Sequence, residues 1–507
     1  MSGLCRFSRL SRLWPAGMLL FAVTLGCGRA APLPVGADQE IWDVQYIGGV
    51  RAGYNRTRIK HENAAGRELV RVEGENHTVI KRGAERIEQE VCFTSLETPD
   101  GKLLEFESEV RGGPTAIGTT GRVDGNRLKL TTTTLGKTAS SSIAWSPEAG
   151  GPYAIELSLR RQPMRPGEQR TVKLLMAGAN MLLTTDLVAA DYESVTLPHG
   201  TYDLLRIAVT IHLPDGATIA EVAWADRTGD VLRNRSDAMK VETCRSTRAE
   251  ALDQTGVGQL DLDALLSVKP DRPLALGHGS SLVRYRVHLK DGDPAAAFIS
   301  GPSQKVVSLD AHTAEITVYG LRPGVTGGNS AAPDEKPGDD DRAPNNLIQS
   351  DNAEIVAMAA QAAGAEKDPW KTAVALEGYV RRTVATTTKD SSGAFSTAAD
   401  VARTREGDCK AHAVLLAALA RARGIPARVA IGLVYVARTG VFGYHMWNEV
   451  YIDTRWFPLD ATLGRGGIGG GHLKLAHRSL AGATAVGSFF PVMKVSGRLQ
   501  IDVLEEK

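Results

Sequence analysis

Three residues with complementary chemistry follow one another near the end of the chain: Cys409, His445 and Asp460. A cysteine nucleophile needs a base that takes its proton and a carboxylate that orients the base, and these residue types occur in that order. Cys409 precedes an alanine- and leucine-rich stretch that ends at Gly424 and Pro426, so we expect it to open a helix. The unpaired N–H groups and the dipole of a helix start favour a thiolate, the form that attacks carbonyls.

The elements around these residues are predicted to be helices first and strands afterwards. Apolar residues recur at helical spacing in residues 355–362 and 373–384, upstream of the cysteine helix. Residues 427–436 and 446–452 have the apolar, β-branched character of strands. This order predicts an α+β domain at residues 347–507. A histidine that opens one strand and an aspartate that closes the next can then lie side by side over the start of the helix.

Residues 39–320 have the pattern of an all-β region with antiparallel, sandwich-like sheets. Gly48 and Gly49 join two apolar runs as a two-residue hairpin turn would. Apolar residues alternate with polar ones in 205–213 and again in 283–289, which is typical of strands with one buried face.

The predicted domain boundaries follow from interruptions of this strand pattern. A short helical stretch near 247–271 separates a β-rich domain at 39–250 from a second β-rich domain or extension at 272–322. Residues 323–346 are rich in Gly, Pro and Asp, a composition that buries little apolar surface, so they are predicted to form a flexible linker.

Charge and the N-terminus indicate the compartment. The 59 basic and 58 acidic residues nearly cancel, which argues against a nucleic-acid partner. Arg6, Arg9 and Arg12 precede an apolar run at 13–25, so residues 1–30 are predicted to be an export signal. The signal ends either at a small-residue cleavage site or at Cys27, whose lipidation would attach the protein to a membrane. We expect a periplasmic, cell-envelope or secreted protein, and the sequence carries no indication of its oligomeric state.

The cysteines outside this signal are Cys92, Cys244 and Cys409. In an oxidising compartment Cys92 and Cys244 can form a disulfide, which leaves Cys409 as the single free thiol. Alternatively, all three are buried and reduced, as free cysteines often are.

Three segments of the chain, 405–409, 445–450 and 456–462, look like the three motif blocks of the transglutaminase-like superfamily, whose fold is related to papain. The resemblance covers residues 345–470. It implies a catalytic triad of Cys409, His445 and Asp460, a helix packed against an antiparallel sheet, and no cofactor. It also implies an exported bacterial type in which a β-rich extension precedes the catalytic domain.

The function that follows is cysteine-dependent acyl transfer or amide hydrolysis. The substrate would be a protein or peptide, attacked at a glutamine side chain or a peptide bond through a thioester. One alternative is a cysteine peptidase or amidase that uses only water. Another is a non-catalytic protein that keeps the fold and binds peptides or cell-wall material.

Two further assignments concern residues near the triad. Trp447, two residues after His445, is predicted to pack over the site and to contact substrate. His412 stands three residues after Cys409, and with His472 and His477 it suggests a zinc site. No other cysteine lies near them, and we predict no metal.

Overall fold

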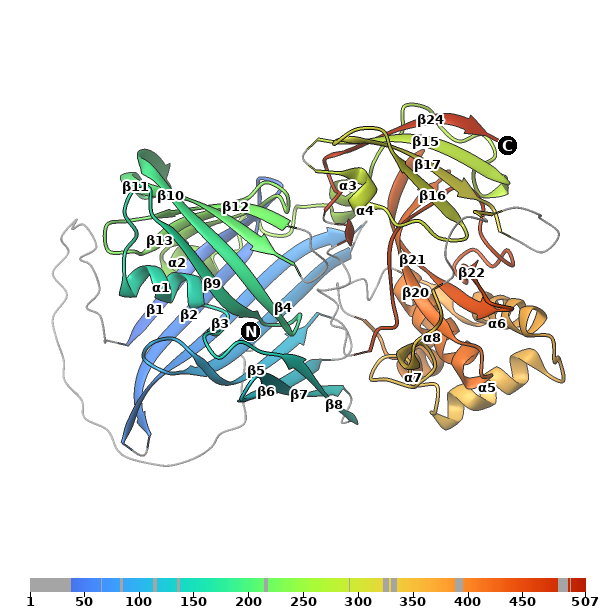
Figure 1. Cartoon of the computed structure of the whole chain (residues 1–507), viewed down its shortest axis with the longest axis horizontal. Coiled ribbons are helices and arrows are strands. Elements are labelled where there is room, and N and C mark those ends of the chain that lie inside the picture. The colour runs from blue at the N-terminus through green and yellow to red at the C-terminus, as the bar shows by residue number, and fades with distance from the viewer. Residues whose placement is uncertain are drawn as a thin grey trace.

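The structure is a computed structural model that describes residues 38–507, except 65, 83–84, 113–115, 135–136, 214–217, 291, 322–327, 330–334, 388–394, 482–490 and 493. The predicted export signal at 1–30, including Cys27, lies outside the described residues. Two regions lie side by side: one large curved sheet, and a mixed region of helices and smaller sheets (Figure 1).

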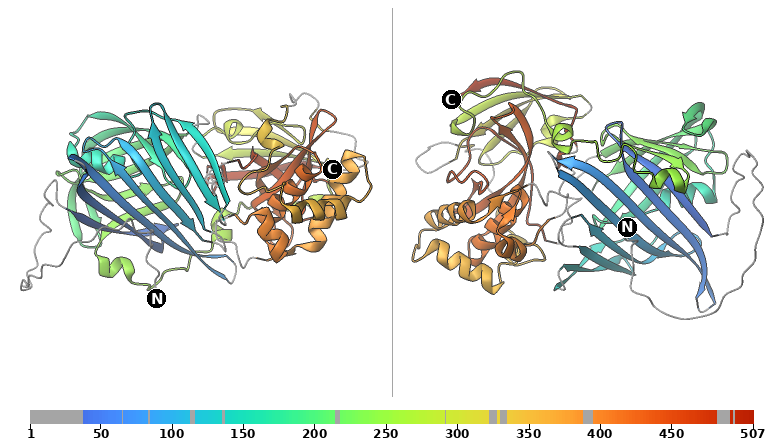
Figure 2. Two further views of the ribbon diagram at one scale, coloured as in Figure 1. Left: turned by 90° about the horizontal axis from the view of Figure 1, so that it is seen from below. Right: turned by 180° about the vertical axis from the view of Figure 1, so that it is seen from behind.

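The N-terminal region is a single fourteen-stranded antiparallel sheet with the order β8-β7-β6-β5-β4-β3-β2-β1-β14-β13-β12-β11-β10-β9. Its strands are β1 (Gln39–Ile47), β2 (Val50–Ala64), β3 (Arg67–Arg82), β4 (Glu85–Glu97), β5 (Leu103–Arg111), β6 (Ile117–Asp124), β7 (Arg127–Thr134), β8 (Lys137–Ala144), β9 (Gln169–Met176), β10 (Met181–Leu197), β11 (Gly200–His212), β12 (Thr218–Ala225), β13 (Val231–Ser236) and β14 (Val241–Ser246). Neighbouring strands are joined by short turns, and β1 pairs with β14 to connect the two halves. The region is therefore one strongly curved sheet, not two stacked ones (Figure 2).

Local sequence explains the first hairpin. Gly48 and Gly49 have φ of 59° and 78°, the left-handed conformation that a two-residue turn requires and that glycine adopts without strain. Ile47 then pairs with Val50 across the turn, as predicted.

The helix α1 (Ala154–Arg161) lies on the concave side of the sheet. Its Leu157 packs against Ile41, Ile59 and Val72 of strands β1–β3. Its Leu159 packs against a second apolar cluster, which comprises residues of β10, β11 and β12. One short helix thus contacts both halves of the sheet, which is possible because the sheet curves around it.

The predicted disulfide between Cys92 and Cys244 is wrong. Cys244 is a buried free thiol on β14, whereas Cys92 lies on β4. Strands β3, β2 and β1 stand between them, and at about 4.8 Å per strand the two cysteines are roughly 19 Å apart, far beyond disulfide reach.

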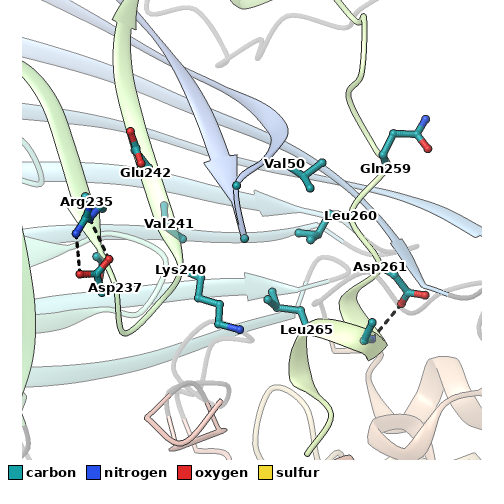
Figure 3. Close-up of a pocket in the computed structure, with 14 residues that line it drawn as sticks. Val50, Arg235, Asp237, Lys240, Val241, Glu242, Gln259, Leu260, Asp261 and Leu265 are labelled. Atoms are coloured by element: carbon teal, nitrogen blue, oxygen red, sulfur yellow. Dashed lines mark hydrogen bonds and ion pairs between the residues drawn. The ribbon is translucent and has the colours of Figure 1, made fainter. Parts of the chain in front are cut away.

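Short helices α2 (Arg248–Leu252) and α3 (Leu262–Leu266) connect the two regions. The turns after β1 and β13 meet the segment 259–265 around a pocket of about 640 Å³ (Figure 3). The charges there are mostly satisfied within the protein: Arg235 pairs with Asp237 at 2.9 Å, and Asp261 caps α3 by accepting a backbone N–H at 2.9 Å.

The segment 272–322 does not pack as a separate domain. It supplies β15 (Leu282–Leu289), α4 (Pro294–Ala297), β16 (Gln304–Ser308) and β17 (Thr313–Tyr319), and these strands form a sheet with the C-terminal β24 (Leu499–Glu506), in the order β16-β17-β15-β24. Its buried residues, such as Tyr285 and Ile316, belong to the same apolar core as the helices of the C-terminal region.

The α+β core comprises α5 (Ala353–Ala363), α6 (Pro369–Thr383), α7 (Ala398–Thr404), α8 (Cys409–Ala422) and a sheet of β20 (Ala427–Val436), β21 (Val441–Ile452), β22 (Arg455–Leu459) and β23 (His472–Arg478). The strand order is β22-β21-β20-β23, and α8 packs between this sheet and the other three helices. Every residue of α8 except Ala422 is buried. Its alanines and leucines give the helix apolar surface on all sides, which suits a position between the sheet and the other helices. The predicted fold class, an all-β N-terminal region followed by an α+β domain, is confirmed.

Residues 335–346, one of the two described parts of the predicted linker, are held to this domain. The backbone carbonyl of Glu335 accepts the indole N–H of Trp456, and the carbonyl of Ala343 accepts a hydrogen bond of 2.8 Å from Arg421. The carbonyls of this segment thus find side-chain donors despite its polar composition. No helix within the described part of the chain is long and apolar enough to cross a membrane.

Candidate active site

Cys409 is the first residue of α8, as the sequence predicts. Asp408 is the N-cap, and its carboxylate accepts the backbone N–H of Lys410 at 3.0 Å. Position 407, before the N-cap, requires glycine, because a Cβ there would lie 2.3 Å from the Cβ of Ala411. The short parallel pair β18 (Ala385–Thr386) and β19 (Glu406–Gly407) fixes the approach to the helix. The sulfur is thereby held where the helix dipole is positive.

His445 and Asp460 reach Cys409 from two neighbouring strands. His445 lies in β21, and Asp460 directly follows β22, which pairs with β21. The Nε2 atom of His445 is 2.9 Å from Oδ2 of Asp460, and the thiol of Cys409 is in hydrogen-bonding contact with the same imidazole. Since Nε2 contacts the carboxylate, Nδ1 is the nitrogen that faces the sulfur. The structure therefore brings all three predicted residues into contact.

Helix and strand are also tied together directly. Asn448, on β21, donates a hydrogen bond of 2.9 Å to the backbone carbonyl of Ala413 in α8. Both residues are buried, so this bond fixes the position of β21, and with it that of His445, relative to α8 and Cys409.

The electrostatics favour a charged imidazole next to the sulfur. Burial alone would lower the pKa of His445, but the Asp460 carboxylate and the contact with Cys409 outweigh it and raise this pKa to about 10. Burial would likewise raise the pKa of Asp460, yet His445 and its hydrogen bonds hold this pKa well below the usual range. At neutral pH the site therefore contains an imidazolium and a carboxylate beside the sulfur.

A second histidine shares Asp460. His472 on β23 is 0% exposed, and its Nε2 lies 3.1 Å from the same Oδ2 atom. Burial lowers the pKa of His472, so it is a neutral donor at neutral pH. Its ring contacts that of His278 edge-on at 5.2 Å, which brings a residue of the 272–322 segment next to the site. The sequence contained one signal for this partnership: His472 opens the strand that follows Asp460.

Trp447 does not have the predicted contact with substrate. Its side chain is 1% exposed and packs with Ala430 and Ile468, so it has no surface to offer a ligand. Its ring is stacked at 6.3 Å against His445 and lies edge-on at 5.2 Å to His472. Trp447 therefore restricts the rotation of both imidazoles from behind.

The histidines considered for zinc have separate partners. His412 Nδ1 contacts the backbone carbonyl of Asp408 at 2.9 Å, and His477 contacts Glu335 at 3.2 Å. The group that could hold a metal ion within the described ranges is instead His445, Asp460 and His472, whose ligand atoms lie within 4.8 Å of one another. These atoms are buried and already bonded to each other, so an ion would have to break the contact between His445 and Asp460.

Glu377 of α6 fixes the loop that carries Asp460. Its carboxylate accepts the backbone N–H groups of Asp460 at 3.0 Å, of Gly467 at 3.4 Å and of Gly466 at 2.6 Å. Burial raises the pKa of Glu377 to about 7, against the effect of these three donors. This residue carries no sequence signal, because an acidic residue within a helix is usually exposed.

Glu449 has the structural role expected of a buried glutamate. It forms ion pairs with Arg428 at 2.8 Å and with Lys474, and all three side chains are at most 5% exposed. Arg428 also lies over the ring of Trp456 at 3.9 Å. The network joins β20, β21 and β23 beside the strand positions that carry the histidines.

Comparison with known proteins supports the family resemblance. Residues 356–461 match the family model of the transglutaminase-like superfamily, and this segment contains Cys409, His445 and Asp460. A candidate cysteine protease of known structure from Cytophaga hutchinsonii is 16% identical, with 44% of this chain and 86% of that chain covered and a TM-score of 0.29. A β-barrel-like protein of a domain of unknown function from Brucella abortus is 10% identical, with 42% and 97% covered and a TM-score of 0.32. No curated protein shows significant similarity. The segment that builds the triad belongs to the transglutaminase-like superfamily.

Proposed function

We propose that this protein is a cysteine-dependent enzyme that cleaves amide bonds of proteins or peptides through a thioester on Cys409. The observation that carries the proposal is the contact of Cys409 with His445, whose other nitrogen lies 2.9 Å from the buried Asp460. A protein that only binds peptides has no need for a nucleophile, a base and an orienting carboxylate in mutual contact.

The proposed reaction has two halves. The thiolate of Cys409 attacks the amide carbonyl carbon, and the tetrahedral oxyanion forms near the backbone N–H of Cys409, which has no acceptor within its own helix. Imidazolium His445 then gives its proton to the leaving nitrogen, the C–N bond breaks, and ammonia or an amine departs. Water or a second amine attacks the thioester while His445 takes up its proton, and the C–S bond breaks to release the product and the cysteine.

The role of Asp460 in this cycle is to hold the imidazole. Its carboxylate fixes Nδ1 towards the sulfur and stabilises the positive charge that His445 carries in the resting ion pair and again after it takes the proton of the attacking water or amine. Because Asp460 is 0% exposed, water does not weaken this interaction.

The decisive experiment is incubation of the purified protein with glutamine-containing peptides and a labelled primary amine, followed by mass spectrometry. Incorporation of the amine identifies a transferase, ammonia loss alone identifies an amidase, and chain cleavage identifies a peptidase. Cys409→Ala should abolish the reaction, and a thioester of the trapped acyl group should map to Cys409. Product formation that is unchanged in Cys409→Ala would contradict the proposal.

The place of action is part of the proposal. The charged start and apolar run of residues 1–30 favour export, and substrates would then be proteins or peptides of the cell envelope or its surroundings. Labelling of the mature N-terminus tests this directly, because cleavage after residue 30 and lipidation of Cys27 give products of different mass.

A further inference from the structure

A cavity of about 360 Å³ lies between strands of the large sheet and the start of α1, and none of its lining residues belongs to the region that holds the triad. Its wall includes apolar side chains from five strands, namely Phe93, Leu174, Met176, Leu183, Ile211 and Leu232. Tyr153 and Glu156, at the start of α1, line the same space. The volume falls within the range of small-molecule sites. Half of the lining residues are polar or charged, so the cavity combines an apolar wall with many polar groups.

The arginines that line this cavity are already neutralised. Arg245 pairs with Asp43 at 3.0 Å. Arg56 pairs with Glu75 at 3.3 Å, and Arg233 pairs with Glu242, a residue outside the cavity, at 2.9 Å. A ligand with a negative charge would have to compete with these carboxylates for each arginine.

Glu156 differs from the other lining acids because no described side chain pairs with its carboxylate at hydrogen-bonding distance. Glu156 is half-buried and lines the cavity. Burial raises its pKa to about 7, and the charges of Asp43 and Glu221 act in the same direction. A hydrogen bond to its own backbone N–H and the charge of Arg160, which pairs with Asp230 at 2.6 Å, act against them. A carboxyl group shielded from water without a directly paired cation is costly to ionise.

We propose that this cavity binds a small organic cation, a primary amine with an apolar tail, whose ammonium group pairs with Glu156 while the tail packs on the apolar wall. The ammonium would supply a directly paired cation, because Arg160 is already paired with Asp230. The site is independent of the chemistry at Cys409, so it stands or falls separately from the proposed function.

The test is titration of the full-length protein with n-hexylamine by isothermal calorimetry, with hexanol and hexanoate as probes of equal length. We expect hexylamine to bind at least about tenfold more tightly than either, because only the amine satisfies the carboxylate. Since the amine pairs with ionised Glu156, its affinity should also rise about tenfold between pH 6 and pH 8, whereas that of hexanol should not.

Two variants identify the site. Glu156→Gln keeps the shape of the side chain and should weaken hexylamine binding at least about tenfold and remove its pH dependence. The matched control, Glu105→Gln, changes an exposed acid on β5 and should bind like the unchanged protein. Circular dichroism melts confirm that each variant is folded.

Three results would overturn the proposal. The first is equal hexylamine affinity in Glu156→Gln and the unchanged protein. The second is tighter binding of hexanoate than of hexylamine. The third is failure of hexylamine, butylamine, octylamine and phenethylamine alike to bind with a Kd below about 1 mM. If Glu156→Gln does not fold, an added Leu232→Trp variant, which fills the cavity, must abolish amine binding.

Discussion

Replacement of Asp460 by asparagine is the sharpest perturbation of the site, because it removes a charge and leaves the shape almost unchanged. In the unchanged protein Oδ2 of Asp460 lies 2.9 Å from His445 and 3.1 Å from His472. The asparagine amide can still accept a hydrogen bond there, but it cannot stabilise an imidazolium by charge. Because Oδ1 of Asp460 also accepts backbone N–H groups, asparagine loses one acceptor as well as the charge, so its effect reports on the electrostatics of the site rather than on packing.

The magnitude follows from the pKa of His445. This pKa is about 10, against about 6.5 for an unperturbed histidine, and the difference corresponds to about 5 kcal/mol in favour of the imidazolium. Without the carboxylate, only the contact with Cys409 opposes burial, and the pKa of His445 falls. If the cation is needed in the rate-limiting transition state, Asp460→Asn should lower kcat/KM by about 10³-fold or more.

The assay does not depend on knowledge of the substrate. Alkylation of Cys409 by iodoacetamide, followed by peptide mapping, measures the thiolate at each pH. In the unchanged protein we expect rapid reaction at neutral pH and little change until the pH approaches 10, where His445 loses its proton. In Asp460→Asn and in His445→Ala the rate at pH 6 should be about ten- to a hundredfold lower, because the ion pair raises the thiolate fraction more than it reduces thiolate reactivity.

Stability gives an independent readout with a defined sign. The pKa of His445 is higher in the folded protein, so its contribution to the free energy of unfolding is complete below about pH 6.5 and is lost as the pH rises through about 10. Asp460→Asn should lack this loss between pH 6.5 and 10. If the alkylation profiles of Cys409 in the unchanged protein, Asp460→Asn and His445→Ala coincide, the ion-pair argument is refuted.

Four further substitutions or measurements test the surroundings of the site. His472→Ala removes a hydrogen bond to a charged group, so it should lower kcat/KM about ten- to a hundredfold and shift the alkaline limb of the pH profile to lower pH. His472→Asn retains an N–H donor and should restore part of both kcat/KM and the alkaline limb. Equal kinetics in the two variants would argue against a positioning role. Glu377→Gln should destabilise the protein by about 1–3 kcal/mol in chemical denaturation at pH 8, and it should abolish the loss of stability that Glu377 causes as the pH rises from about 4.5 to 7. Lys474→Met should cost about 3–5 kcal/mol by the same measurement, since it leaves a buried glutamate with one partner fewer. Cys244 should be found as a free thiol by non-reducing peptide mapping and should react only after unfolding, because burial raises its pKa to about 12.

Much of the α+β core could be predicted because local sequence determines it. The helix start at Cys409, its end before Gly424, and the strand at 427–436 follow from capping residues and periodicity, and the structure places them at those positions. The triad could be predicted from the three motif blocks of the resemblance, and because His445 lies on β21 while Asp460 directly follows the neighbouring β22.

The missed features depend on contacts between distant segments. Strand β15 pairs with β24, which lies more than 200 residues later in the chain, so that Val287 lies beside Ile501. No local sequence pattern identifies β24 as the partner of β15. The curvature that turns fourteen antiparallel strands into one sheet is equally invisible in an alternation that also fits a sandwich. His472 was considered only as a zinc ligand, because its hydrogen bond to Asp460 requires β23 to lie next to β20.

The charges at the centre of the site explain why one carboxylate should need two histidines. A thiolate, an imidazolium and a carboxylate together leave one net negative charge in a buried place, and such a charge must be satisfied by donors. The carboxylate of Asp460 accepts from His472 and from the backbone N–H groups of Thr462 at 2.9 Å and Leu463 at 3.4 Å. The N-terminus of α8 serves the sulfur in the same way. A second cationic imidazole would compete with His445 for the shared carboxylate, and a neutral one does not. Burial keeps His472 neutral, which leaves the positive charge on the imidazole that contacts Cys409.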